Sequence, residues 1–212
     1  MLSPHTSSYE RKCSVSTSEK SYHHGDLRAA LLKAAIELLE SGEPFSMRAV
    51  ARRAGVSQTA PYRHFADRKA LDGAVAVQGF QDLTADLAAA LAGAPDGAGP
   101  VARLGNLGVT YVLFALKRPT EFRIMFGNEC DDADAERVLA AQGLHAVLDD
   151  VLAEMFPSAD VSHLSLAFWG MAHGLAFLHL DGKLRPEDLG EVEGRVRAAA
   201  AAVLTMNGTP GA

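Results

Sequence analysis

A glutamine, a threonine and an alanine stand in a row at Gln58-Thr59-Ala60. A glutamine amide can pair with adenine through two hydrogen bonds, and threonine or alanine can meet the methyl group of thymine. Hydroxyl, basic and aromatic side chains that suit phosphate oxygens lie close by in the sequence. Together they predict a DNA-contacting set, comprising Ser46, Arg48, Ser57, Gln58, Thr59, Ala60, Tyr62, Arg63, His64 and Lys69.

Two short helices joined by a tight turn would position these residues. Ser46 is placed to cap a helix over 47–54, and Ser57 to cap a second helix over 58–65. Gly55 can adopt the positive φ that closes the first helix. Segment 46–65 therefore predicts a helix-turn-helix whose second helix enters DNA, although a helical hairpin with a solvated basic face would show much of this pattern. Pro61 lacks an N–H group, so we expect a tightened first turn in the second helix.

Around this segment the chain resembles the TetR family of bacterial regulators over about residues 22–80. The matching residues are Leu38, Leu39, Phe45-Ser46-Met47, Ala51, Ala54-Gly55-Val56-Ser57, Tyr62-Arg63-His64-Phe65, Lys69 and Leu71. The resemblance implies an all-α protein, in which a three-helix DNA-binding domain precedes a helical ligand-binding and dimerisation domain. It also implies that Tyr62, His64 and Lys69 touch phosphates. A repressor released from operator DNA by a small molecule is the commoner mode of such regulators.

Further along, Trp169, His173 and Gly174 resemble the signature of the family's Trp-His-Gly subgroup. Trp169 and His173 are four residues apart and share one face of a helix. Two interpretations stay open: the pair lines a ligand pocket, or Trp169 is core and His173 a satisfied buried histidine. The pocket interpretation predicts an unidentified, mainly apolar effector and walls formed by Phe80, Leu83, Tyr111, Phe114, Phe122, Met125, Phe126, Trp169 and His173.

Glycine, proline and capping residues divide the whole chain into helices and no sheet. Asp26 is expected to cap the first helix, which ends at Gly42, and Pro186 is expected in the first turn of the last. The remaining helices are expected near 67–92, 100–117, 119–126, 133–156, 161–181 and 186–206. We predict a disordered arm over 1–21, a DNA-binding domain over 22–83, a regulatory and dimerisation domain over 84–206, and a tail over 207–212.

Gly170 and Gly174 are costly inside a helix unless another helix approaches them closely. The family resemblance implies that the last two helices pair with a second copy in a four-helix bundle, so we expect a homodimer. A dimer would also read two DNA half-sites instead of one.

Charge is distributed unevenly along the chain. Residues 1–71 hold 11 Lys and Arg against 7 Asp and Glu, whereas residues 72–212 hold 9 against 19. A basic N-terminal third on an acidic body suits a protein that meets double-stranded operator DNA at one end only.

Other classes of protein are less well supported. Cys13 and Cys130 are too few for a disulfide framework, and residues 161–180 include three histidines, so they predict a core helix and not a membrane span. His23-His24-Gly25-Asp26 could be taken for a metal cluster of an enzyme, but no further ligand is placed by spacing. We predict no enzyme, metal or cofactor, and a cytoplasmic location. A helical protein-binding adaptor is the other alternative.

Overall fold

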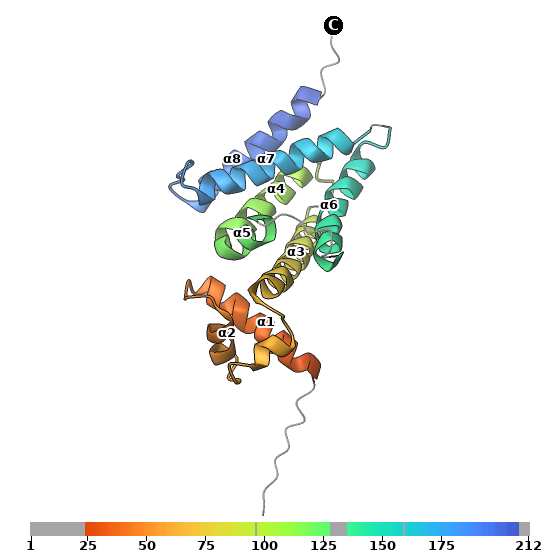
Figure 1. Ribbon diagram of the computed structural model, residues 1–212. Coiled ribbons are helices and arrows are strands. Elements are labelled where there is room, and N and C mark those ends of the chain that lie inside the picture. The colour runs from red at the N-terminus through yellow and green to blue at the C-terminus, as the bar shows by residue number, and fades with distance from the viewer. Residues whose placement is uncertain (1–23, 96, 128–134, 159, 208–212) are drawn as a thin grey trace, which may run out of the picture.

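A computed structural model describes residues 24–95, 97–127, 135–158 and 160–207. All regular structure in these ranges is helical, which confirms the all-α prediction. The helices form two cores that α3 joins (Figure 1). In chain order the elements are α1 (His24–Glu40), α2 (Met47–Arg53), the 3-10 helix η1 (Ala60–Arg63), α3 (Arg68–Ala92), α4 (Pro100–Lys117), α5 (Pro119–Gly127), α6 (Ala135–Met155), α7 (Ser162–Leu180) and α8 (Leu189–Asn207).

The N-terminal core forms where α1, α2 and the start of α3 meet. Leu31 and Leu38 of α1, Val50 of α2 and Leu71 of α3 are completely or almost completely buried in it. Helix α1 begins at His24, so Asp26 lies inside the helix and is not its cap. The helix ends as expected, because Gly42 takes a φ of +69° and its N–H donates to the carbonyl of Leu39.

Helix α3 belongs to both cores. Asp67 caps it, since its carboxylate accepts a hydrogen bond of 2.9 Å from the N–H of Ala70. Its first turns place Leu71 and Val75 in the N-terminal core, and later turns place Phe80 and Leu83 in the core of the body. Ile124 of α5 also packs against both cores. Two elements therefore connect the N-terminal helices mechanically to the body.

Proline starts α4 and α5 where the sequence predicts it, at Pro100 and Pro119. Helix α6 is fastened to the end of α5 by Arg137, which is 6% exposed. The Arg137 guanidinium donates to the carbonyl of Met125 at 2.8 Å and to that of Ile124 at 3.3 Å. These carbonyls belong to the last turn of α5, where a positive charge is favourable.

Helix α8 starts later than expected. It begins at Leu189, three residues after Pro186, so Pro186 is not in its first turn. The start is set instead by Asp188, whose carboxylate accepts a hydrogen bond of 2.9 Å from the N–H of Glu191. Helices α7 and α8 pack together along one side of the body (Figure 1).

The outer face of α7 is apolar and lacks large side chains at its centre. Leu166 and Leu178 are 60% and 42% exposed on it. A Cβ atom built on Gly170 or Gly174 would meet nothing within 4 Å. Within a single copy of the chain, therefore, the helix that was expected to approach these glycines is not provided by another part of the described structure.

No helix in the described part of the chain is both long and apolar enough to cross a membrane.

Candidate DNA-binding surface and ligand cavity

The turn between α2 and η1 has the geometry that the sequence predicts. Ser46 caps α2, because its Oγ accepts a hydrogen bond of 3.2 Å from the N–H of Ala49. Gly55 has a φ of +71°, and Val56 then donates its N–H to the carbonyl of Ala51 at 3.0 Å. This closes α2 and redirects the chain within a few residues, as a helix-turn-helix requires.

The second helix of the motif is shorter than expected. It is a 3-10 helix over Ala60–Arg63 and not an α-helix over 58–65, and the Ser57 side chain does not cap it. The Oγ of Ser57 lies 3.2 Å from that of Thr59 instead. Pro61 explains the change, because it has no N–H to donate to the carbonyl of Ser57. The N–H of Ala60 takes that carbonyl at 3.0 Å and tightens the turn.

The structure exposes two of the three residues predicted to read bases. Gln58 and Thr59 are exposed at the start of the motif's second half, with Ser57 beside them. Ala60 is only 9% exposed, so its methyl group packs inward and is not presented to a thymine. Pro61 is buried as well, and this buried pair anchors the tight turn.

The predicted phosphate-contacting residues surround this position. Ser46, Arg48, Arg63 and Lys69 are exposed, and Tyr62 is 53% exposed although it is aromatic. His64 is half-buried. These side chains come from the start of α2, from η1 and from the start of α3.

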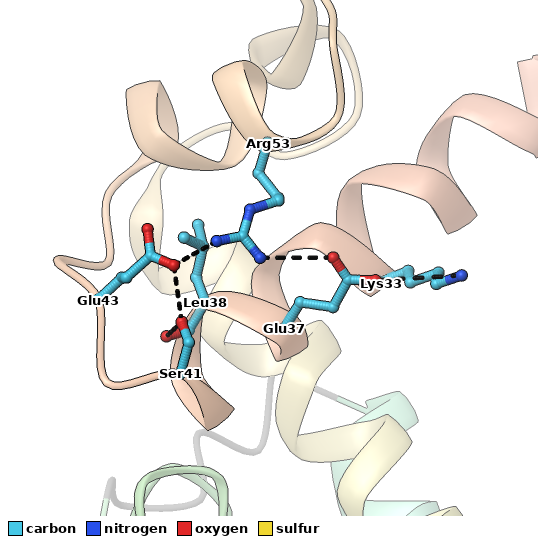
Figure 2. A network of polar contacts seen from close by, with 6 residues as sticks. All are labelled: Lys33, Glu37, Leu38, Ser41, Glu43 and Arg53. Atoms are coloured by element: carbon cyan, nitrogen blue, oxygen red, sulfur yellow. Dashed lines mark hydrogen bonds and ion pairs between the residues drawn. The ribbon is translucent and has the colours of Figure 1, made fainter.

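Two other arginines of this region hold the structure together. Arg53 pairs with Glu43 and also reaches Glu37, at 3.6 Å from Nη1 to Oε2, so it joins α2 to α1 and to the loop between them (Figure 2). Ser41 completes the network by donating to Glu43 at 3.1 Å. The Arg53 guanidinium lowers the pKa of Glu43 by hydrogen bonding and charge.

Arg68 makes a second such clamp. Its guanidinium carbon lies 3.8 Å from the centroid of the Phe45 ring. The same group donates to the Phe45 carbonyl and to the carboxylate of Asp72, each at 2.7 Å. In the structure of the free protein, therefore, Arg53 and Arg68 are both engaged with other residues of the N-terminal region.

A cavity opens in the body between α3, α4, α6 and α7. Its open space is about 500 Å³ when the mouth and the solvent in front of it are included. Of the nine predicted wall residues only Tyr111 and Trp169 line it. Helix α6, which carries none of the predicted wall residues, supplies a further wall. The complete lining is Leu87, Leu104, Leu107, Gly108, Tyr111, Leu144, His145, Val147, Leu148, Phe168, Trp169, Met171 and Ala172.

The other predicted wall residues have different places. Phe80, Leu83, Phe122 and Met125 are buried core, and Phe114 is buried beside a separate surface hollow between α3 and α4. Phe126 and His173 belong to a group of aromatic rings behind the cavity, with centroids 4.7 Å apart. The physical reason is packing, because the rings of α4, α5 and α7 fill the space among themselves.

Three polar groups lie at the boundary between the cavity and the aromatic rings, and only two of them are hydrogen-bonded. The Tyr111 hydroxyl and Nδ1 of His173 are 2.8 Å apart and share a hydrogen bond. Burial raises the pKa of Tyr111 and lowers that of His173, so both are neutral near pH 7. Trp169 is close enough to Tyr111 to lower its pKa somewhat against burial, yet its buried indole N–H makes no hydrogen bond of good geometry to any described residue.

A second unsatisfied group lies where α5 meets α3 and α1. Glu121 is 1% exposed, and neither of its carboxylate oxygens has a hydrogen-bond partner among the described residues. Arg118 is 3.7 Å away, but it also pairs with Asp82 at 2.7 Å. Burial raises the pKa of Glu121 to about 7, against the lowering effect of Arg118, while Asp82 and Glu40 raise it further.

The described ranges contain no group of three His, Cys, Asp or Glu side chains that could hold a metal ion. The cluster His23-His24-Gly25-Asp26 begins outside the described residues, and no side chain of it is described.

Known proteins match both parts of the chain. The model of the bacterial regulatory proteins of the tetR family matches residues 31–75, and that of the tetracyclin repressor-like C-terminal domain matches residues 104–203. A protein of unknown function from Rhodococcus sp. is 34% identical, with a TM-score of 0.74 over 88% of this chain and 98% of its own. A TetR transcriptional regulator from the same genus is 23% identical, with a TM-score of 0.55 over 84% of this chain and 97% of its own. No curated protein shows a significant match.

A helix-turn-helix with exposed amide, hydroxyl and basic side chains, joined to a helical body with an internal cavity, defines a DNA-binding transcriptional regulator. The chain belongs to the TetR family. Regulators of this family bind operator DNA and act as dimers.

Proposed function

We propose that the protein is a repressor that reads its operator through Gln58 and Thr59 and leaves it when a small, mainly apolar ligand enters the body. One observation carries the DNA-reading part: Gln58 and Thr59 are exposed at the leading end of the motif, while the neighbouring Ala60 and Pro61 are buried and fix their position. A base-reading group must be held rigidly to make a bidentate contact. A good contact of this kind discriminates against the wrong base by about 1–3 kcal/mol.

Phosphate contacts would fix the protein's register on the duplex. We assign them to Ser46, Arg48, Tyr62, Arg63 and Lys69, which are exposed around the same end of the molecule. His64 is half-buried and would contribute at the edge of this surface. Such contacts carry affinity and not sequence preference.

The homodimer would form through α7 and α8. The support is the outer face of these helices, where Leu166 and Leu178 are exposed and no atom stands over Gly170 or Gly174. Gly194 of α8 has equally open surroundings. A second copy packed here in a four-helix bundle would cover the leucines and bring a helix close to the glycines, which offsets their cost of about 1 kcal/mol each.

The finer family placement is also part of the proposal. We place the chain in the Trp-His-Gly subgroup because Trp169 and His173 face each other along α7, with ring centroids 5.5 Å apart, and Gly174 follows. We divide the chain into a DNA-binding domain over 22–83 and a regulatory and dimerisation domain over 84–206. As a binder of operator DNA it would act in the cytoplasm, without enzymatic activity.

Two matched variants test the DNA-binding surface. Lys69→Ala is expected to weaken binding to all DNA sequences and to flatten the salt dependence by about one unit per protomer. Gln58→Ala is expected to change sequence preference at one position of each half-site. The measurement is selection from random DNA, followed by titration of the selected duplex over a salt series.

The opposite pattern would show that the motif docks in another orientation. In that case Lys69→Ala would change preference, and Gln58→Ala would lower affinity uniformly. Sedimentation of Leu166→Arg compared with the wild type checks the dimer, because a charge on the outer face of α7 should yield monomers.

A further inference from the structure

The cavity in the body has a chemistry that restricts what can occupy it. About 50 Å³ of it is open to the centre of a water-sized sphere, which is more than the roughly 10–15 Å³ that one water needs, so a small and slender molecule can enter. No Asp, Glu, Lys or Arg lines it, and apart from Tyr111 and His145 the polar lining is the indole of Trp169. A charged ligand entering this cavity would lose its hydration without gaining an ionic partner, which is strongly unfavourable.

Trp169 supplies an unused hydrogen-bond donor at this cavity. Its indole nitrogen is buried and unpaired among the described residues, whereas the nearby Tyr111 hydroxyl is already bonded to His173. An indole nitrogen can only donate, and the Tyr111 oxygen, although it keeps a lone pair when it donates to His173, does not meet hydrogen-bond geometry with the indole N–H, so a well-aligned acceptor must come from elsewhere. A buried donor without a well-aligned acceptor is destabilising, and a ligand that brings the acceptor would recover part of that cost.

Neighbouring rings hold the indole in place. The His145 ring of α6 meets it edge-on at a centroid distance of 4.7 Å. The centroid of the His173 ring, one turn further along α7, lies 5.5 Å away. The donor is therefore preorganised, which lowers the ordering cost of binding.

We propose that this cavity binds a small, uncharged molecule that is apolar along its length and carries one hydrogen-bond acceptor, such as a ketone or ester carbonyl, for the indole N–H of Trp169. This inference rests on the proposed function, because it names the class of effector that the regulator would recognise.

The position of the cavity links its occupant to the DNA-binding end. Tyr111 borders the cavity, and its partner His173 lies 4.7 Å from the ring of Phe126 on α5. Helix α5 also carries Ile124, which packs against the N-terminal core. A ligand that moves Tyr111 would thus act on α5 and, through it, on the spacing of the two DNA-reading surfaces, provided that it prefers one arrangement of the dimer.

Trp169 is the only tryptophan of the chain, so its fluorescence reports on the cavity directly. The probes are 2-octanone, its isostere 2-methyl-1-octene in which a methylene group replaces the carbonyl oxygen, octanoate and octylammonium. In the wild-type protein 2-octanone is expected to change Trp169 emission saturably, and the two charged probes are expected to have no effect at equal concentration. Binding of either charged probe as tight as that of the ketone would overturn the proposal.

The hydrogen bond is tested by calorimetry on Trp169→Phe, which keeps a ring but removes the N–H. The affinity for 2-octanone should fall about tenfold, while that for 2-methyl-1-octene should change less than about twofold. Comparing each probe with itself across the two proteins cancels the difference in their solubility. An equal loss for both probes would mean that Trp169 serves only as an apolar wall.

A second pair of variants keeps Trp169 and tests the location. Leu148→Phe narrows the cavity and should abolish the fluorescence response. Leu139→Phe lies on the same helix but is 66% exposed and should leave the response intact. Equal responses in both variants would place the site elsewhere. Operator binding is measured separately. If the wild-type protein binds operator DNA but none of the probes, only the cavity proposal is refuted. If the wild-type protein does not bind operator DNA at all, the proposed function is refuted.

Discussion

The two cores of this protein treat their polar groups in opposite ways. Around the N-terminal core, arginine side chains form ion pairs at the surface. Arg53 pairs with Glu37 and Glu43, and Arg68 pairs with Asp72. In the body, Glu121 and the Trp169 indole are buried with atoms that have no hydrogen-bond partner among the described residues, although Arg118 lies 3.7 Å from Glu121. The N-terminal region is thus built to keep one shape, and the body contains groups that a ligand or a proton can satisfy.

The largest expected effect tests whether these two regions are mechanically separate. Phe122→Ala removes a fully buried ring that lies 4.8 to 5.8 Å from four other aromatic rings, and should cost about 3–5 kcal/mol. Phe65→Ala removes a ring that is 3% exposed in the N-terminal region. Because α3 passes through both cores, we expect both changes to shift the same urea transition, followed by Trp169 fluorescence. A transition that Phe65→Ala leaves unmoved would show that the two cores unfold independently.

The next effect is the pH dependence contributed by Glu121. Its pKa of about 7 in the folded protein lies above its ordinary value of 4.5, so the folded protein binds the proton more tightly than the unfolded chain. Stability therefore falls as pH rises from about 4.5 through 7, by up to roughly 3 kcal/mol. Glu121→Gln should remove this loss, stabilising the protein clearly at pH 8 and little at pH 5.

Urea titrations at both pH values measure the effect. Glu154→Gln is the matched control, because Glu154 is exposed and its pKa is lowered by Arg103. If Glu121→Gln destabilised the protein at pH 8, the carboxylate would be charged and held by Arg118, and the body would be as well paired as the N-terminal region.

A smaller effect separates two serines that look alike in the sequence. Ser46 accepts a hydrogen bond from the backbone of α2, whereas the Ser57 side chain meets only that of Thr59. Ser46→Ala should therefore cost about 1 kcal/mol of stability, and Ser57→Ala close to nothing. Thermal unfolding of the two variants checks this. An equal loss of stability in both would indicate that Ser57 caps an α-helix over 58–65, as the sequence predicts.

These serines also show how far the sequence can predict the fold. Local chemistry was sufficient where one residue decides, as at Gly55 with its positive φ, Asp67 at the start of α3, and Pro100 and Pro119 at the first positions of α4 and α5. It failed where two signals compete. Ser57 looks like a cap, but Pro61 removes the donor that an α-helix would need there.

The candidate site was predictable at the DNA-binding end and only partly in the body. The residues that we propose to face DNA follow one another within a single motif, so local structure is enough to bring them together. The cavity depends on how helices cross, and the aromatic rings that were expected to line it, such as Phe122 and Phe126, pack against each other. Helix α6 contributes His145 and Leu148, whose inward direction is set only by its packing on α3 and α7.

The smallest expected effect concerns Arg53, where sequence and structure suggest different roles. As a basic residue at the end of α2 it could contact a phosphate, but its guanidinium is held between Glu37 and Glu43 (Figure 2). Partly exposed ion pairs of this kind contribute about 0.2–1 kcal/mol and weaken as salt rises. Arg53→Met should therefore lower stability by about half a kcal/mol at low salt and by less at high salt. It should leave the salt dependence of operator binding unchanged, in contrast to Lys69→Ala. A salt dependence flattened by about one unit would mean that DNA pulls Arg53 out of its network, and that the N-terminal region also changes partners when it binds.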